Sequence, residues 1–244
     1  MRIPRICVFE SLVRGAEILL PPQAGEHLAR VLRLERGHPL LLFSGDGRDY
    51  RAEISQLAKR AVTARVLDDG VAIDRESPLQ LTLAQGVARG EKMDLIVQKA
   101  TELGVQRIVP LITERTEVKL DAERSGRRLA HWQAVIAGAC EQSGRSRLPT
   151  LEAPVRLAPW AAGLGDMPGL RLALDPLGGT STRDLPPFSA ALLVVGPEGG
   201  LSEQDLNLLD QADFQGLKLG PRILRTETAG LAALTALQAI HGDL

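Results

Sequence analysis

The sequence predicts an α/β protein in two parts, a region of short strands followed by a mostly parallel sheet with helices on both faces. In the first 75 residues, apolar and polar residues alternate with the period of two that is typical of strands. Beyond residue 78, short apolar runs alternate with segments of helical periodicity, the pattern of a parallel sheet. The polar stretch 68–78, which ends in proline, separates the two patterns. We therefore expect one domain at residues 1–74 and a second at residues 75–244.

The first region contains strands, turns and one helical interruption. Its strand patterns occupy residues 40–43, 50–54 and 61–67. Gly45-Asp46-Gly47 marks a turn between the first two of them. Residues 27–34 carry apolar side chains near helical spacing, with Arg30 and Arg33 on another face. A meander or a small barrel is the expected architecture.

The second region alternates between the two element types. Apolar runs of strand length lie at residues 79–84, 105–111, 170–174, 190–195 and 217–219. Helical spacing is found at residues 93–103, 129–140, 202–212 and 228–240. Gly104 is placed for a C-terminal cap, and Ser202 for an N-terminal cap with acidic Glu203 in the turn after it. We expect these helices to cover both faces of the sheet.

Composition narrows the possible functions. The chain has 244 residues, of which 44% are hydrophobic and 24% charged, so we expect a folded protein with a substantial core. Only 3% are aromatic, too few for an RNA-recognition sheet that depends on repeated base stacking. The formal net charge is −1, so any nucleic-acid binding must come from local basic clusters. The clearest cluster is the segment 124–147, in which the arginines are accompanied by few acidic residues.

Cysteine, histidine and hydropathy patterns argue against further classes. Cys7 and Cys140 form neither a disulfide framework nor a CxxC pair, and the histidines show no metal-binding spacing. We expect no metal. The N-terminus lacks the apolar core of a signal peptide, and no apolar run approaches the roughly 20 residues that span a bilayer. We expect no membrane association and a cytoplasmic location.

Two strand-to-helix loops could carry chemistry, because ligands of open parallel sheets bind beyond the carboxyl ends of the strands. The first, GPEGG at residues 196–200, precedes the helix that Ser202 caps. Its glycines allow the backbone to approach a ligand, whereas Glu198 would repel phosphate. The loop suits a ligand that is uncharged or cationic at that point. A tight connection without a binding role is the alternative.

The second loop, LGPRILRTETA at residues 219–229, places arginines, a glutamate and threonines between a strand and a helix. Ile223 and Leu224 lie in its middle, where a surface loop seldom has two large aliphatic residues. We expect them to cover a flat apolar ligand. The alternative is an ordinary helix start, with Thr226 or Glu227 as the cap and Arg225 in a surface ion pair.

At these two loops the sequence resembles the paired C-terminal signature of the small-subunit ribosomal RNA methyltransferase E family, which belongs to the SPOUT superfamily. The two segments are LLVVGPEGGLSEQDL and LKLGPRILRTETAGLAALTAL. Earlier stretches agree with the family in order: RIPRICV, HLARVLRLERG, KMDLIVQKATELGVQRIVPLITERT and ACEQSGRSRLP. The resemblance therefore covers nearly the whole chain.

The resemblance implies an S-adenosylmethionine-dependent methyltransferase that modifies ring nitrogen N3 of a specific uridine in 16S ribosomal RNA, on the assembled 30S subunit. It implies a PUA-like RNA-binding β-barrel at residues 1–74 and a SPOUT domain at residues 75–244 whose C-terminal part forms a deep trefoil knot. It also implies a homodimer, with the methyl donor bound between the two loops. The cationic sulfonium and flat adenine of that donor fit the glutamate-containing turn and the aliphatic cover.

By motif position, the resemblance implies a cofactor site made of Leu174, Gly196, Glu198, Gly199, Gly200, Leu219, Gly220, Ile223 and Leu224. It puts Arg225 and Glu227 where the target base arrives. Our hypothesis is that Arg225 stabilises negative charge on the uracil oxygens while Glu227, or a water that it holds, accepts the N3 proton. We expect phosphate contacts from Arg2, Arg5, Arg30, Arg33, Arg124 and Arg145.

Other functions stay open from the sequence. A SPOUT enzyme that methylates ribose or guanine in transfer RNA would favour a freely folded small RNA over a ribosomal particle. A catalytically silent RNA-binding scaffold could keep the knot without binding the methyl donor. An enzyme acting on nucleotide phosphates is disfavoured, because GPEGG is neither a GxGxxG nor a Walker loop.

Overall fold

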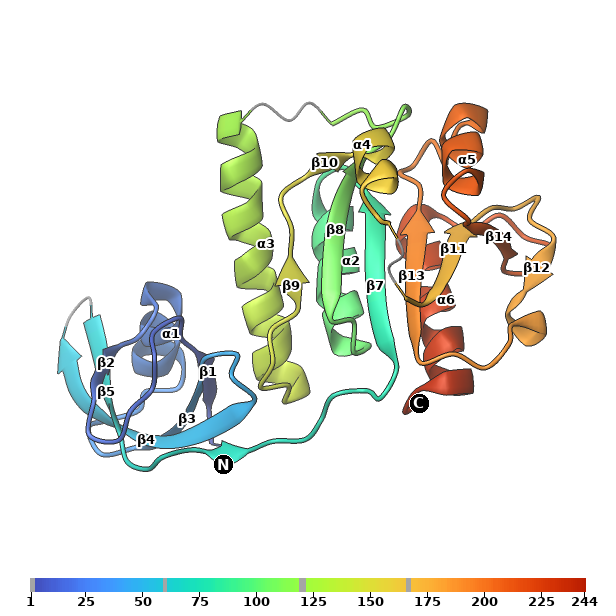
Figure 1. Ribbon diagram of the computed structural model, residues 1–244. Coiled ribbons are helices and arrows are strands. Elements are labelled where there is room, and N and C mark those ends of the chain that lie inside the picture. The colour runs from blue at the N-terminus through green and yellow to red at the C-terminus, as the bar shows by residue number, and fades with distance from the viewer. Residues whose placement is uncertain (1–2, 59–60, 119–121, 166–167) are drawn as a thin grey trace. The chain divides into compact units, whose positions relative to one another are not determined.

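The computed structural model describes residues 3–58, 61–118, 122–165 and 168–244 (Figure 1). The chain divides into two compact units. The first comprises Met1–Glu76 together with Ala137–Leu148, and the second comprises Ser77–Ile136 together with Pro149–Leu244. The segment Ala137–Leu148 thus joins the N-terminal residues, although it follows them by 60 positions or more in the printed sequence. Separate folding of residues 1–74 and 75–244 stays a prediction.

The first unit is built on a six-stranded sheet in the order β1-β3-β4-β5-β2, with β6 paired to β4. The strands are β1 (Arg5–Cys7), β2 (Glu17–Leu19), β3 (Pro39–Phe43), β4 (Arg48–Ala58), β5 (Ala61–Val66) and β6 (Val71–Ala72). β1 and β3 are parallel, and the other pairs are antiparallel. The three strands predicted for this region correspond to β3, β4 and β5, and those predictions are confirmed.

The helical patch of the first unit begins earlier than predicted. Helix α1 (Pro22–Glu26) runs directly into a π-helical segment, His27–Val31. Pro22 is tolerated at the start of the helix because the first backbone N–H groups have no intrahelical acceptor. Arg33, just after the π-helical segment, has a φ of 52°, a left-handed conformation that is uncommon outside glycine.

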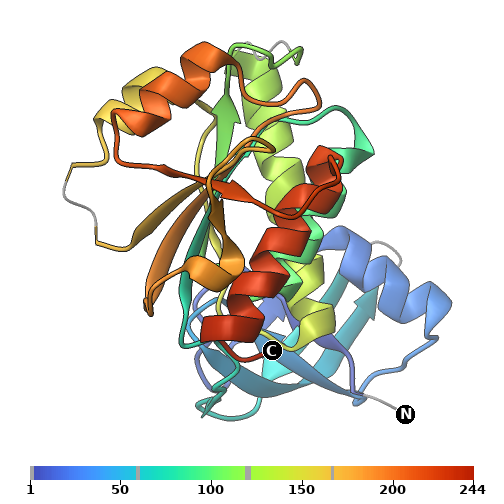
Figure 2. The ribbon, with the colours of Figure 1, turned by 90° about the vertical axis from the view of Figure 1, so that its right-hand side faces the viewer.

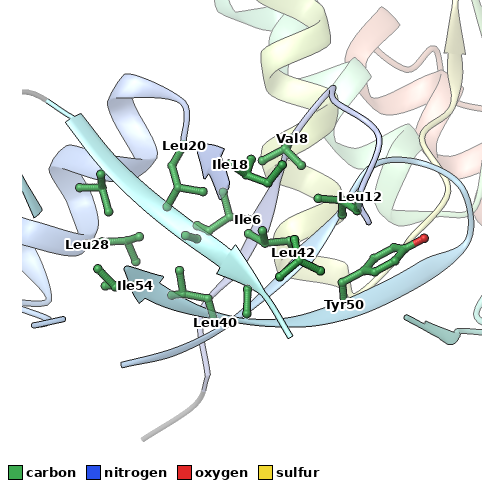
Figure 3. Close-up of a cluster of buried hydrophobic side chains, with 14 of the residues drawn as sticks. Ile6, Val8, Leu12, Ile18, Leu20, Leu28, Leu40, Leu42, Tyr50 and Ile54 are labelled. Carbon is green, nitrogen blue, oxygen red and sulfur yellow. The ribbon is translucent and has the colours of Figure 1, made fainter. Parts of the chain in front are cut away.

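One core fills the first unit (Figure 3). Along β4, the side chains of Tyr50, Ala52 and Ile54 are buried while Arg51 between them is exposed, which is the alternation that the sequence predicted. Leu28 of the π-helical segment is fully buried in the same cluster. The apolar face of the helical patch therefore packs on the sheet, and its arginines stay on the other side.

The second unit contains an eight-stranded sheet in the order β10-β8-β7-β13-β11-β14-β12, with β9 also paired to β8. All of these pairs are parallel, as predicted. The strands are β7 (Gln80–Gly86), β8 (Arg107–Ile112), β9 (Thr150–Leu151), β10 (Val155–Arg156), β11 (Leu170–Leu174), β12 (Thr180–Ser181), β13 (Ala190–Val195) and β14 (Gln215–Lys218). The helices are α2 (Glu91–Glu102), α4 (Leu157–Ala162), α5 (Glu203–Asp210) and α6 (Thr226–His241), with a 3₁₀ turn at Thr182–Asp184. Helix α3 (Ala122–Ser143) begins in the second unit, and its residues from Ala137 onward belong to the first.

Helices cover both faces of this sheet, and strand β13 shows why (Figure 2). Val194 belongs to a buried cluster with residues of α4 and α5, such as Trp160 and Leu209. The next residue, Val195, approaches Gly230 of α6 on the opposite face. Because successive side chains of a strand point to opposite faces, the continuous apolar run of β13 can pack against helices on each side.

The sheet order decides where a ligand can bind. β11 lies between β13 and β14, and all three are parallel. The loops that follow these strands therefore emerge at the same edge of the sheet, beyond the carboxyl ends of the strands. The GPEGG loop and the second loop, which are separated by about 20 positions in the sequence, become neighbours there.

Candidate functional site

A cavity of about 600 Å³ opens at the carboxyl ends of β11, β13 and β14. Every residue that the sequence analysis assigned to a cofactor lines it: Leu174, Gly196, Glu198, Gly199, Gly200, Leu219, Gly220, Ile223 and Leu224. Arg225 lines the same cavity. A volume in this range is that of a small-molecule site, and its walls are mostly apolar with a few polar groups.

The GPEGG loop can make its turn only with glycine at its ends. A Cβ added to Gly196 would lie 2.6 Å from the carbonyl carbon of Gly200 and 2.7 Å from the backbone nitrogen of Leu201. Gly200 has a φ of 70°, which favours glycine. The outgoing helix α5 is then fixed by the predicted Ser202 cap, which forms a capping box with Asp205, each bond 3.0 Å long.

A buried hydrogen-bond cluster ties the second loop to the first. Thr226 Oγ1 donates to the carbonyl oxygen of Gly196 at 2.6 Å. Gln85 of β7, which is fully buried, donates from Nε2 to Thr226 Oγ1 at 3.0 Å and lies 3.3 Å from the same Gly196 carbonyl oxygen. Thr226 begins α6, but its side chain is turned toward Gly196, and the N-cap residue Arg225 makes no side-chain capping bond. The sequence analysis missed Gln85 and considered Thr226 only as a cap.

Glu198 is one of the acidic residues of the cavity wall, together with Asp175 and Glu203. Its Oε1 accepts a hydrogen bond from the backbone N–H of Arg89 at 3.0 Å and lies 3.6 Å from Lys92 Nζ. Partial burial acts to raise the pKa of Glu198, but hydrogen bonds from backbone N–H groups and the charge of Lys92 outweigh it and hold the pKa below its ordinary value. The cavity therefore presents an anion to its ligand, as the sequence analysis expected.

Arg225 and Glu227 occupy different positions around this cavity. Arg225 is exposed and lines it, whereas Glu227, in the first turn of α6, lies outside the described lining. Glu227 Oε2 is 3.7 Å from Nζ of Lys92, the same ammonium group that approaches Glu198. Lys92 is the first residue of the segment KMDLIVQKATELG, which the family resemblance covers, but no role was assigned to it because it lies more than 100 positions away from both carboxylates.

Arg115 also lines the cavity, although the sequence indicated no role for it. Its Nη1 donates to the carbonyl oxygens of Gly199 at 2.9 Å and Leu201 at 3.3 Å. These bonds fix the far half of the GPEGG loop from outside the loop. The residue lies in the segment LITERT, which the family resemblance covers, but only the fold brings it to the glycines.

The arginines assigned to phosphate contacts are not equivalent. Arg30, Arg33 and Arg124 are exposed. Arg30 forms an exposed ion pair with Glu26 at 2.5 Å, within one turn. Arg2 lies outside the described residues. The remaining two, Arg5 and Arg145, have largely buried side chains.

Arg5 and Arg145 form ion pairs inside the first unit, which favours a structural role for both, and their contact with RNA stays a prediction. The Arg5 side chain is 7% exposed and binds Asp49 through Nε at 3.0 Å and Nη2 at 2.8 Å. It also donates to the carbonyl oxygen of Cys140 at 2.8 Å. The Arg145 side chain is 4% exposed and pairs with Glu76 at 2.5 Å. Both guanidinium groups therefore have hydrogen-bond acceptors inside the first unit.

Exposed arginines of the second unit gather in an open groove of about 610 Å³. Its lining includes Arg89, Arg124, Arg127 and Arg128, together with Glu117. Arg89 of the groove donates its backbone N–H to Glu198 of the cavity, so one hydrogen bond links the two sites. The sequence analysis had identified the basic segment 124–147 but not Arg89.

The described residues lack the features of a metal site and of a membrane span. They contain no group of three or more histidine, cysteine or acidic residues able to hold a metal ion. Among the same residues, every helix is too short or too polar to cross a membrane. Cys7 and Cys140 are buried and unpaired.

Comparison with known proteins identifies the family. A family model described as an RNA methyltransferase domain matches residues 75–238, and one described as an RNA methyltransferase PUA domain matches residues 20–67. Ribosomal RNA small subunit methyltransferase E from Buchnera aphidicola subsp. Schizaphis graminum is 32% identical over 100% of this chain and 98% of its own length. The chain belongs to the ribosomal RNA small subunit methyltransferase E family. The Bacillus subtilis member is 32% identical, with 89% of each chain covered.

Solved structures of methyltransferase E family members and relatives have the same fold. A methyltransferase from Legionella pneumophila, solved in complex with the cofactor S-adenosylmethionine, is 41% identical and superposes with a TM-score of 0.93 over 100% of both chains. A methyltransferase E from Neisseria gonorrhoeae, bound to S-adenosylmethionine, is 37% identical with a TM-score of 0.86 over 100% of both chains. The α/β architecture with a PUA-like N-terminal part is therefore that of the methyltransferase E family.

Proposed function

We propose that this chain transfers a methyl group from S-adenosylmethionine to N3 of a specific uridine in small-subunit ribosomal RNA, on the assembled 30S subunit in the cytoplasm. The observation that carries the proposal is the cavity between the two loops, which brings together every residue assigned to the donor. Membership in a family of small-subunit ribosomal RNA methyltransferases supports the RNA substrate.

The residues of the cavity fit S-adenosylmethionine. Glu198 is held as an anion at the wall, where it can attract a sulfonium cation. Leu174, Leu219 and Ile223 give apolar surface for a flat adenine. The relatives from Legionella pneumophila and Neisseria gonorrhoeae were solved with this same cofactor. These features also favour an enzyme over a silent RNA-binding scaffold.

The proposed reaction needs a proton acceptor and an anion stabiliser from the protein. The bound donor supplies an electrophilic methyl carbon on sulfur. As the bond from N3 to that carbon forms and the sulfur–carbon bond breaks, the N3 proton must leave the uracil. Arg225 at the cavity wall stabilises the negative charge on the uracil oxygens, and Glu227, or a water that it holds, takes the proton. The target base must leave its stack so that its Watson–Crick edge reaches the cavity.

We propose that RNA phosphates bind at Arg30 and Arg33 of the first unit and along the arginine groove of the second unit. Arg124, Arg127 and Arg128 line that groove beside the residue that bonds to Glu198. Phosphate contacts of this kind release counterions, so each one steepens the dependence of binding on salt. Replacing Arg127 and Arg128 by glutamine should weaken RNA binding. It should also reduce the slope of the logarithm of the binding constant against the logarithm of the salt concentration by about 1 to 2. An unchanged slope would remove the groove from the proposal.

The finer features of the fold are also proposals. We propose a closed barrel in the first unit, a trefoil knot in the C-terminal part of the second, and a homodimer, as the family resemblance implies. The bond between Thr226 and Gly196 supports the knot, because it fastens the chain entering α6 to the loop after β13. Sedimentation equilibrium would measure the dimer directly.

Mass mapping of the modified base tests the proposed function. Purified protein and labelled methyl donor are incubated with 30S subunits that lack the modification, with naked 16S ribosomal RNA and with transfer RNA. We expect label on N3 of one uridine in the 30S subunit. Label on ribose or guanine, or on transfer RNA alone, would favour the other SPOUT activity. Arg225→Ala and Glu227→Gln should abolish most turnover; near-normal turnover of both would remove their assigned roles.

A further inference from the structure

We infer that Lys92 is a positioning residue that holds Glu198 of the donor cavity and Glu227 beside the acceptor site in one charged unit. This inference rests on the proposed function, and it adds a residue to it. Lys92 is the second residue of α2, and its side chain is 37% exposed. It lies outside the described lining of the cavity.

The geometry places one cation between two anions. Lys92 Nζ lies 3.6 Å from Glu198 Oε1 and 3.7 Å from Glu227 Oε2. The two carboxylates come from different segments, the loop after β13 and the first turn of α6. Two like charges near one site repel each other, and an ammonium group between them relieves that repulsion. Lys92 therefore relieves the repulsion between the two carboxylates.

The two oxygens of Glu227 are in different environments. Oε2, the atom nearest to Lys92, is buried and accepts no hydrogen bond from any residue that the structure describes. The side chain as a whole remains 16% exposed, so its accessible surface lies elsewhere than at Oε2. A cation behind the inner oxygen compensates for its burial and leaves the outer part of the side chain for the substrate.

The same helix contains a lysine in an ordinary ion pair for comparison. Lys99 is 40% exposed and pairs with Glu102 at 2.8 Å, three residues along α2. That pair is local and lies outside the described lining of the cavity. Lys92 and Lys99 thus have similar exposure and the same secondary structure, but only Lys92 joins carboxylates from two distant segments. Lys99→Met is therefore a matched control for Lys92→Met.

A double-mutant cycle tests the inference. Turnover at saturating donor and RNA is measured for Lys92→Met, Glu227→Gln, the double variant and Lys99→Met. We expect Lys92→Met to lower turnover about fivefold or more, which is the effect of losing roughly 1 kcal/mol of charge interaction. Lys92→Arg should restore most of the loss. In the Glu227→Gln background, Lys92→Met should have little further effect on turnover, because the Glu227 charge that Lys92 stabilises is gone and the donor is saturating.

A second measurement is independent of turnover. Carbon-13 NMR of labelled glutamate carboxyls, assigned with Glu198→Gln, follows the titration of Glu198. We expect Lys92→Met to raise the pKa of Glu198, because one of the groups that lower it is lost, while Lys99→Met leaves it unchanged.

Three outcomes would overturn the inference. The first is an equal loss of turnover on Lys92→Met in the unaltered protein and in the Glu227→Gln variant. The second is an effect of Lys99→Met on turnover as large as that of Lys92→Met. The third is a pKa of Glu198 that stays the same in Lys92→Met. Failure of the proposed function looks different. In that case the unaltered protein neither binds S-adenosylmethionine nor methylates RNA, while the NMR titration still reports on Lys92.

Discussion

Thr226 and Gly196 are 30 positions apart in the chain, yet Thr226 Oγ1 donates a hydrogen bond to the Gly196 carbonyl oxygen at 2.6 Å. Thr226 is buried, and so is its donor Gln85. Since neither group can exchange its partner for water, this bond fixes the spacing of the two cavity loops.

Removing this hydrogen bond should weaken donor binding. Thr226→Val keeps the volume of the side chain but removes the 2.6 Å bond to the Gly196 carbonyl oxygen, which keeps only the longer 3.3 Å contact with Gln85 Nε2. Loss of about 1–2 kcal/mol corresponds to roughly a tenfold higher dissociation constant for S-adenosylmethionine. Isothermal calorimetry measures this dissociation constant. Thr235→Val is the control, because Thr235 bonds only to the Leu231 carbonyl oxygen within α6; an equal effect of both variants would contradict the assignment.

Arg5→Met should destabilise the first unit without changing the RNA contact. The substitution leaves Asp49 partly buried without its bidentate partner and also removes the contact of the guanidinium with the Phe43 ring, 4.5 Å from its centroid. Breaking a buried pair on one side lowers the free energy of unfolding by about 3–5 kcal/mol. Chemical denaturation measures this loss. Arg33 is exposed, so Arg33→Met should leave the free energy of unfolding nearly unchanged but flatten the salt dependence of RNA binding.

The buried thiols should make the protein sensitive to alkali. Burial raises the pKa of Cys7 to about 12 and that of Cys140 to about 11, from an ordinary value of 9.0. Above pH 9 the unfolded chain releases these protons and the folded chain keeps them, so the stability that they contribute is lost as pH rises toward the folded values. We expect the midpoint of urea unfolding to fall between pH 8.5 and about 10.5, and to fall less in Cys7→Ala. The same pH dependence of the urea midpoint in the unaltered protein and in Cys7→Ala would contradict the raised pKa of Cys7.

Arg115→Met should loosen the donor cavity. The side chain donates to the carbonyl oxygens of Gly199 and Leu201, and its loss leaves that half of the GPEGG loop without its outside support. We expect the affinity for S-adenosylmethionine to fall about fivefold to tenfold, with little change in thermal stability, because Arg115 is exposed. Unchanged affinity would show that the loop keeps its shape without Arg115.

Local sequence signals predicted the second unit well. The apolar runs of β11 and β13 coincide with the structure, and the Ser202 cap forms with Asp205 as its partner. Gly104 ends α2 with a φ of 81°, as its position suggested. These features depend on residues close together in the chain. Helix α4 was missed because six residues are too few to show helical periodicity.

Long-range relationships escaped prediction for a physical reason. The sequence alone does not distinguish a charged residue on the surface from one that forms an ion pair inside the protein. Arg5 and Arg145 were therefore predicted to be phosphate ligands. Their partners Asp49 and Glu76 lie 44 and 69 positions away. Lys92 and Gln85 were missed for the same reason. The cavity residues were found because the family motif, and not their spacing, connects the two loops.

Donor binding by a backbone variant tests the central claim most directly. Gly196→Ala places a methyl group where the Gly200 carbonyl carbon is 2.6 Å away, whereas Gly126→Ala in α3 meets no atom within 4 Å. We predict that calorimetry detects S-adenosylmethionine binding to the unaltered protein and to Gly126→Ala, and that Gly196→Ala loses it while keeping a cooperative thermal transition. No binding by the unaltered protein, or equal binding by a folded Gly196→Ala, would contradict a methyl donor held between these two loops.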